Sequence, residues 1–138
     1  MRLRRILAVF GFATGLMLAA AAPASASLPT YIFYAPDGTA YTCTNAVVSP
    51  DGGATACFEP TGEHLGICDS AADGHHPGIW YIIDSGSVRE NDYSIGHYYC
   101  IDINLDLPET STVTYRACNY EGSTAISCSN YVTVSAKG

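Results

Sequence analysis

The stretch CDSAADGHHPGIW, from Cys68 to Trp80, places two acids and two adjacent histidines between a cysteine and the only tryptophan of the chain. Its acids and bases are Asp69, Asp73, His75 and His76. Carboxylates and imidazoles at short spacing could bind a metal ion or transfer protons. Three interpretations follow: a metal site, a recognition loop, or a turn that joins two strands.

A calcium site is the first interpretation. Asp69, Asp73 and Gly74 match positions 1, 5 and 6 of an EF-hand loop. Position 3 is an alanine, however, and Trp80 stands at position 12, where a bidentate acid is required. We therefore expect no EF-hand site, and a weaker calcium site on Asp69, Asp73 and backbone carbonyls is the alternative. The spacing favours a connecting turn whose Asp side chains accept hydrogen bonds from backbone amides.

A histidine metal site is the second interpretation. His75 and His76 are adjacent, and adjacent side chains on an extended strand point to opposite faces. They would bind one zinc or copper ion together only in a turn, with His64 or His97 completing the site. The sequence favours solvated loop histidines, so we expect no metal and no cofactor.

Catalytic motifs are absent from the sequence. It contains no G-x-S-x-G elbow, no H-E-x-x-H motif and no Gly-rich phosphate loop. Acids are frequent throughout, so a pair such as Asp102 and Asp106 has no special standing as a glycosidase pair. We therefore predict that the protein is not an enzyme.

The first 26 residues have the pattern of a secretory signal. Three arginines precede the apolar run 6–22, and Ala24-Ser25-Ala26 forms a small-residue cleavage site. Cleavage would leave a single secreted domain, residues 27–138, with three basic residues against thirteen acids, a balance of −10. This charge excludes nucleic acid and anionic membranes as partners and would suit a cationic one.

Six cysteines lie in the predicted mature chain, and the closest two are ten residues apart. No C-x-x-C spacing supports zinc binding. An exported chain meets oxidising conditions, so the even count predicts three disulfides. The residues are Cys43, Cys57, Cys68, Cys100, Cys118 and Cys128.

Short segments rich in Tyr, Val, Ile and Thr, separated by Gly, Pro and Asp, predict an all-β antiparallel fold. Residues 31–35 and 39–43 flank Pro36-Asp37-Gly38, so we expect an N-terminal β-hairpin. SPDGGATAC echoes APDGTAYTC fourteen residues later, with Cys57 at the place of Cys43, which favours a bond between these two cysteines. The other predicted strands are 54–60, 64–70, 78–84, 97–105, 111–120 and 125–136, with 87–96 irregular.

Cys68, Trp80 twelve residues later, an acid-containing turn LPET and Cys118 within YRAC resemble the immunoglobulin-like pattern over residues 64–136. The resemblance implies an immunoglobulin-like β-sandwich with Trp80 in its core against an inter-sheet disulfide, Cys68–Cys118. Cys100–Cys128 then remains by elimination. The family's corner tyrosine would stand at Arg116, whereas Tyr115 is three residues before the cysteine. The chain also resembles small secreted, cysteine-stapled β proteins of actinobacteria, a likeness that implies no particular activity.

Pairing between cysteines close in sequence is the rival scheme. It joins Cys57 to Cys68 and Cys118 to Cys128 across hairpins, and leaves Cys43 with Cys100. Six cysteines allow 15 pairings, and the sequence does not choose among them.

Ten tyrosines follow the predicted signal peptide. They either reflect the usual amino-acid composition of β-strands or form a recognition surface. In the immunoglobulin-like registration, 69–78 and 119–127 lie at one end of the sandwich. The predicted binding patch there consists of Asp69, Asp73, His75, His76, Tyr120 and Glu121. We expect a secreted, monomeric, non-catalytic binding module for an extracellular protein or polymer. The alternatives are a structural envelope-associated protein and an enzyme inhibitor presenting the loop 119–127.

Overall fold

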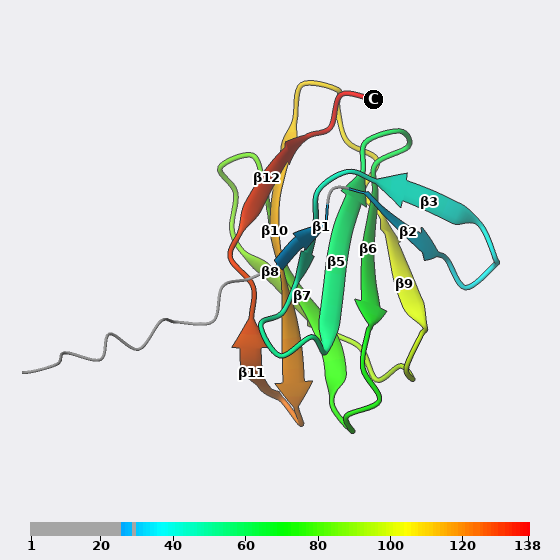
Figure 1. Cartoon of the computed structure of the whole chain (residues 1–138). Coiled ribbons are helices and arrows are strands. Elements are labelled where there is room, and N and C mark those ends of the chain that lie inside the picture. Colours follow the sequence, from blue (N-terminus) through cyan, green and yellow to red (C-terminus); the bar gives the residue numbers. More distant parts are fainter. Residues whose placement is uncertain (1–25, 29) are drawn as a thin grey trace, which may run out of the picture.

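The computed structural model describes residues 26–28 and 30–138, in which every regular element is a β-strand (Figure 1). The predicted signal peptide lies outside the described residues except for Ala26. No described segment is a helix that could span a bilayer. The strands are β1 (Ala26–Leu28), β2 (Tyr31–Tyr34), β3 (Ala40–Cys43), β4 (Ala46–Val48), β5 (Ala54–Glu59), β6 (His64–Asp69), β7 (His76–Ile83), β8 (Arg89–Asp92), β9 (Cys100–Asn104), β10 (Thr112–Glu121), β11 (Thr124–Cys128) and β12 (Val132–Ser135).

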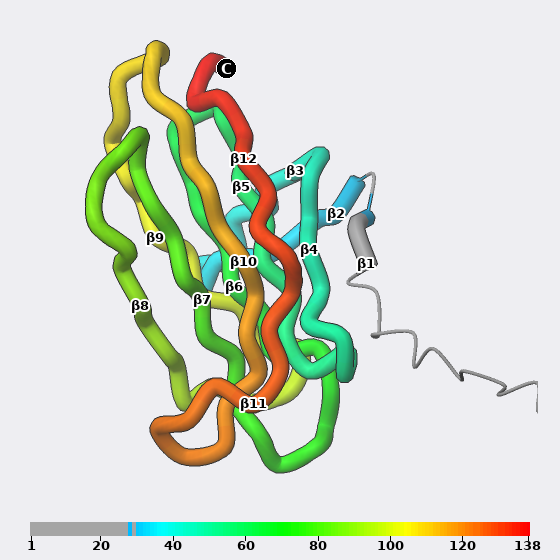
Figure 2. Tube along the Cα trace, turned by 90° about the vertical axis from the view of Figure 1, so that its left-hand side faces the viewer, coloured from blue at the N-terminus to red at the C-terminus, as the bar shows by residue number. Residues whose placement is uncertain are grey.

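Two five-stranded antiparallel sheets pack face to face, and a separate two-stranded hairpin lies against one of them (Figures 1 and 2). The first sheet has the order β1-β4-β5-β6-β9, and the second has the order β11-β10-β7-β8 with β12 also paired to β10. The hairpin is β2-β3. The expectation of an all-β antiparallel protein with three disulfides is confirmed.

The N-terminal hairpin predicted from its turn residues is present as β2-β3. Gly38 has φ of 89°, and the Asp37 carboxylate accepts a hydrogen bond from the Thr39 backbone amide at 2.9 Å. The predicted strand 125–136 is instead divided into β11 and β12. Ser129 interrupts it, because its hydroxyl accepts a hydrogen bond from the Ala117 backbone amide at 3.0 Å. The segment 87–96, predicted irregular, contains the edge strand β8.

The main core lies between the two sheets. The central strands β5, β6, β7 and β10 contribute alternate side chains to it, as a pleated strand with one face inward must. Tyr115 crosses this core, fully buried, and its hydroxyl donates to the Asn45 carbonyl at 2.7 Å. The buried set is Val47, Ala54, Ala56, Phe58, Leu65, Ile67, Ile79, Tyr81, Val113, Tyr115, Ala117 and Ala136.

A second core lies under the hairpin, on the outer face of the first sheet. Phe33 of β2 is 1% exposed and packs over Gly66 of β6, where a Cβ would lie 2.7 Å from the phenyl ring. The disulfide Cys43–Cys57 joins β3 to β5 and so fixes the hairpin to the sheet. β5 and β6 are therefore buried on both faces, which explains their nearly continuous apolar sequences.

The disulfides confirm one predicted bond and correct two. Cys43–Cys57 is present, whereas Cys68 pairs with Cys100 and Cys118 with Cys128. The predicted Cys68–Cys118 and Cys100–Cys128 bonds are wrong. Cys68 follows the core residue 67 and Cys118 follows the core residue 117, so both sulfurs point away from the core, on opposite outer faces. Each bonds instead to the residue directly opposite on the neighbouring strand. The rival scheme was right about Cys118–Cys128 only.

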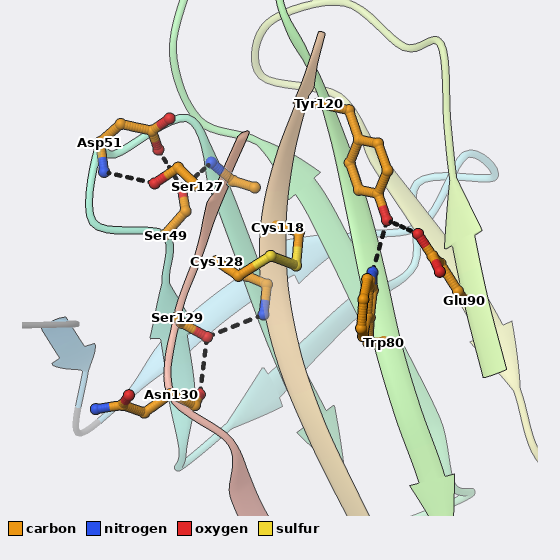
Figure 3. The surroundings of a disulfide bond; sticks show 12 residues. Ser49, Asp51, Trp80, Glu90, Cys118, Tyr120, Ser127, Cys128, Ser129 and Asn130 are labelled. Atoms are coloured by element: carbon orange, nitrogen blue, oxygen red, sulfur yellow. Dashed lines mark hydrogen bonds between the residues drawn. A yellow bond between two sulfur atoms is a disulfide. The ribbon is translucent and has the colours of Figure 1, made fainter. Parts of the chain in front are cut away.

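Trp80 does not lie in the core. Ile79 and Tyr81 face the core, so Trp80 lies partly buried on the outer face of the second sheet (Figure 3). Its indole Nε1 donates to the Tyr120 hydroxyl at 2.6 Å, and that hydroxyl donates to the Glu90 carboxylate. The placement of the tryptophan against an inter-sheet disulfide is therefore wrong.

Gly66→Ala tests how tightly the hairpin sits on the sheet. The added methyl group would displace the Phe33 ring, and overpacking of this kind costs about 1–3 kcal/mol. Urea unfolding should show this loss, and Phe33→Leu in the same chain should recover part of it. Gly96→Ala is the matched control, because its Cβ would meet Tyr99 only at an ordinary 3.6 Å. An unchanged midpoint for Gly66→Ala would contradict the close contact.

Candidate functional site

Part of the predicted patch lies together at one end of the two sheets. The His75 Nε2 atom is 2.9 Å from the Glu121 carboxylate, and its Nδ1 atom is 3.4 Å from the Asp73 carboxylate. These contacts join the β6–β7 loop to the β10–β11 turn. The sequence argument that both loops occupy the same end is therefore consistent with the geometry.

Asn119 connects two of the loops at this end. It is 1% exposed, and its Nδ2 donates to Asp51 at 3.0 Å and to Asp73 at 2.9 Å. The Asp51 carboxylate also accepts from the Ser49 hydroxyl at 2.6 Å, and the Asp51 backbone amide donates to the Ser127 hydroxyl (Figure 3). The hydrogen bonds on the carboxylates are internal, so this network explains the loop arrangement without a ligand.

Hydrogen bonds set the acidity of these two aspartates. Burial acts to raise the pKa of Asp51, but its hydrogen bonds, led by that from Ser49, outweigh burial and leave the pKa below its usual value. The pKa of Asp73 is lowered chiefly by the hydrogen bond from the His75 backbone amide. Both groups are therefore held in the ionised form.

The remaining predicted residues, His76, Tyr120 and Asp69, make other contacts. His76 and Tyr120 are on the outer face of the second sheet, with ring centroids 5.8 Å apart, and His76 is 3.0 Å from Asp92. Burial raises the pKa of Tyr120 to about 12, and its bond to the Glu90 carboxylate adds to the rise. Asp69 is 5% exposed, and its carboxylate accepts a hydrogen bond from the Ala71 backbone amide at 3.2 Å. The predicted residues thus make two groups of contacts, Asp73 and Glu121 with His75, and Tyr120 with His76, while Asp69 bonds locally.

Within residues 26–28 and 30–138, no group of three or more His, Cys, Asp or Glu side chains is arranged to hold a metal ion. The weak calcium alternative needed Asp69 and Asp73 to converge on one ion. Their carboxylates are instead bonded to different partners, Asp69 to a local amide and Asp73 to Asn119.

A groove lined by tyrosines is the candidate site that the sequence analysis missed. It lies between the β2-β3 hairpin and the segment that enters β9, and it comprises two adjoining cavities of about 570 and 260 Å³. Three tyrosines on it are strongly exposed: Tyr34 by 60%, Tyr98 by 84% and Tyr99 by 69%. We call this feature the tyrosine groove; its residues are Tyr31, Ile32, Phe33, Tyr34, Ala35, Pro36, Gly38, Thr55, Cys68, Asp69, Ser70, Ile95, Gly96, Tyr98, Tyr99, Cys100 and Ile101.

Backbone bonds to Asp69 hold the exposed tyrosines in place. The Tyr98 amide donates to the Asp69 carbonyl, and the Asp69 amide donates to the Tyr99 carbonyl, each at 3.0 Å. Tyr98 has φ of 71°, a conformation that is unfavourable for a bulky side chain. The His97 ring stacks on the Tyr98 ring with centroids 3.5 Å apart. A strained, solvent-exposed aromatic residue of this kind is typical of functional sites.

The chemistry of the tyrosine groove is apolar and hydroxylic. Asp69 is its only ionisable residue other than tyrosine, and the carboxylate of Asp69 is engaged by the Ala71 amide. Thr55 and Ser70 place their hydroxyl oxygens 2.6 Å apart at the wall. Burial raises the pKa of Tyr31, against a smaller opposing effect of its hydrogen bond with Thr55. In a chain with thirteen acids, the lining of the tyrosine groove is therefore unusually poor in charge.

Comparison with protein-family models, with curated proteins and with solved structures finds no match to this chain.

Asp51→Asn tests the loop network through its pH dependence. A carboxyl whose pKa is lowered by folding stabilises the protein above its unfolded pKa of about 3.9, and this stabilisation is lost as pH falls through the folded pKa. We expect Asp51→Asn to lower stability by about 1 kcal/mol at pH 7 and to reduce the loss between pH 4 and 2. Urea unfolding at both pH values measures this. Asp106→Asn is the control, since Asp106 is exposed and outside the network. Parallel pH curves for Asp51→Asn and the parent protein would contradict the network.

Proposed function

We propose that the protein is a secreted, non-catalytic binding module whose tyrosine groove binds an uncharged polysaccharide chain. The observation that carries this proposal is Tyr98, a bulky residue held at positive φ with most of its ring in solvent beside two other exposed tyrosines. Contact of apolar ring surface with water is unfavourable, so a cluster of exposed rings supports a surface that a ligand covers.

The surroundings of the rings support a sugar ligand. Tyrosine rings offer flat apolar faces on which the C–H faces of sugar rings stack, and phenolic hydroxyls offer hydrogen bonds at their edges. Thr55, Ser70 and Tyr31 add hydroxyl groups that can donate to or accept from sugar hydroxyls. The two adjoining cavities are open to solvent, which suits a chain more than an enclosed small molecule.

The groove is also well suited to rigid binding. Cys43–Cys57 fixes one wall, the hairpin, and Cys68–Cys100 lies in the wall formed by β9. Rigid walls reduce the ordering cost of binding. Three disulfides are consistent with a protein that functions outside the cell. The cationic partner expected from the charge balance would bind away from this groove, at the acidic surface.

Two finer expectations on the fold belong with this proposal. We propose that the sheets are a divergent immunoglobulin-like sandwich and that the chain is related to small secreted β proteins of actinobacteria. Paired antiparallel sheets and a central strand with the sequence YRAC support the first idea. The in-sheet disulfides make it a sandwich without the inter-sheet bond that marks antibody domains.

Protease inhibition is a second candidate, favoured by the β10-β11 hairpin. The bond Cys118–Cys128 closes the predicted inhibitory loop, and Ile126 on that loop is exposed. Inhibition of a secreted protease that is relieved by Ile126→Ala would select this function over polysaccharide binding.

Tyr98→Ala and Tyr34→Ala test the tyrosine groove. Truncation of an aromatic hot spot costs about 2 kcal/mol or more, so each variant should weaken binding by more than tenfold. The probes are soluble mixed-linkage β-glucan and chitohexaose, measured by calorimetry and by affinity electrophoresis. Val88→Ala is the control, because Val88 is exposed and apolar but outside the groove.

The proposal fails if neither probe binds, or if binding is retained in both tyrosine variants. A loss that occurs equally in Val88→Ala would indicate a general effect on folding and would count against the groove. Thermal unfolding of each variant provides the folding check.

A further inference from the structure

A cation without an acidic partner lies on the outer face of the second sheet. Arg116 of β10 is directly opposite Trp80 of β7. Its guanidinium carbon lies 4.0 Å from the centroid of the Trp80 ring and 4.7 Å from that of the Tyr131 ring. One ring comes from β7 and the other from the segment between β11 and β12, so the strands on both sides of β10 contribute to the site.

No carboxylate neutralises this guanidinium within the described part of the chain. The four ion pairs found there all have histidine as the base. The Arg116 Nε atom is buried and has no hydrogen-bond partner. A chain with thirteen acids and six basic residues would be expected to pair a partly buried arginine with an acid. This arginine is held by aromatic rings instead.

The acid nearest in the sheet register is engaged elsewhere. Glu90 of β8 lies opposite Trp80, on the same face as Arg116. Its carboxylate accepts a hydrogen bond from the Tyr120 hydroxyl, which itself accepts from the Trp80 indole (Figure 3). Tyr120 can approach because Gly78 beneath it has no side chain. Glu90 is thus bound by Tyr120, and the Arg116 guanidinium remains without an acid.

We propose that Arg116 is the anchor of a second binding site, which takes the carboxylate of a single uronic-acid residue in an otherwise uncharged polysaccharide, because the acidic protein chain would repel a polyanion. Two cation–π contacts fix the guanidinium plane, and a fixed planar fork matches the two oxygens of a carboxylate. The missing salt bridge is then supplied by the ligand. No described element covers this face, whereas the hairpin covers the outer face of the first sheet (Figures 1 and 2).

A polysaccharide fits this face because of what surrounds the cation. Tyr131 is 42% exposed and offers an aromatic surface beside the guanidinium. Thr114 and Thr133, on neighbouring strands, have their hydroxyl oxygens 2.8 Å apart. A ring, hydroxyl groups and one cation on an open sheet would suit a carboxylated sugar chain that crosses the strands. This site lies on the opposite sheet from the tyrosine groove and does not depend on the groove's function.

Trp80 is the only tryptophan of the chain, so its fluorescence reports on this site without a label. Titration of the protein with glucuronoxylan, in which single uronic-acid residues branch from an uncharged chain, should change the emission and reach saturation, and added NaCl should weaken the response. Carboxyl-reduced glucuronoxylan, which lacks the carboxylates, should give no change. Arg116→Gln should weaken binding at least tenfold, and Arg116→Lys should weaken it less, because it keeps the charge and loses the fork.

Arg89→Gln is the matched control, since it removes a different arginine, which is exposed and outside the site, and should bind as the parent protein does. Thermal unfolding checks each variant; if Arg116→Gln does not fold, Arg116→Lys and the carboxyl-reduced polymer carry the test. Equal affinity of Arg116→Gln and the parent protein would overturn the proposal, and so would equal binding of the carboxyl-reduced polymer. Tighter, Arg116-dependent binding of poly-glutamate would contradict a polysaccharide ligand and indicate an acidic peptide.

Discussion

The contact between Phe33 and Gly66 sets the position of the β2-β3 hairpin and, with it, of the candidate site. It places the β2-β3 hairpin on the outer face of the first sheet, where Cys43–Cys57 fixes it covalently. Without this layer, the apolar outer faces of β5 and β6 would be exposed to water at a cost of about 25 cal/mol per Å². The same layer forms one wall of the tyrosine groove. Stability and the candidate site therefore depend on one piece of packing.

On the outer face of each sheet a glycine makes room for an aromatic ring, with different results on the two sheets. On the first sheet a glycine admits Phe33, whose ring is buried by the hairpin. On the second sheet Gly78 admits Tyr120, whose hydroxyl joins Trp80 to Glu90 and leaves Arg116 without an acid. The first face is closed by an added layer, and the second stays open. Apolar stacking is thus concentrated at the groove, while an unpaired cation is available on the far side.

The sequence predicted the turns and most of the strands, but it did not show which face of a sheet each side chain would occupy. Pro36-Asp37-Gly38 predicted the hairpin because a turn depends on a few adjacent residues. The run GIWYIID is apolar at successive positions. It therefore lacks the alternation of polar and apolar residues that would have shown that Trp80 faces outward. The disulfides depend on the same inward or outward choice, which explains why Cys68–Cys118 was wrong. The tyrosine groove depends on backbone pairing between Asp69 and Tyr98, which are distant in sequence. The adjacent tyrosines of HYYC were the only local signal for it.

Whether the exposed tyrosines form the ligand surface can be measured by aromatic NMR spectra of tyrosine-labelled protein, recorded during titration with an uncharged oligosaccharide such as chitohexaose, because each ring reports its own surroundings. Saturable shifts are expected for the Tyr34, Tyr98 and Tyr99 ring signals, with the buried Tyr115 and Tyr131 beside the other sheet unchanged. Shifts confined to Tyr131, or no shift of any ring, would mean that the tyrosine groove is not the ligand surface.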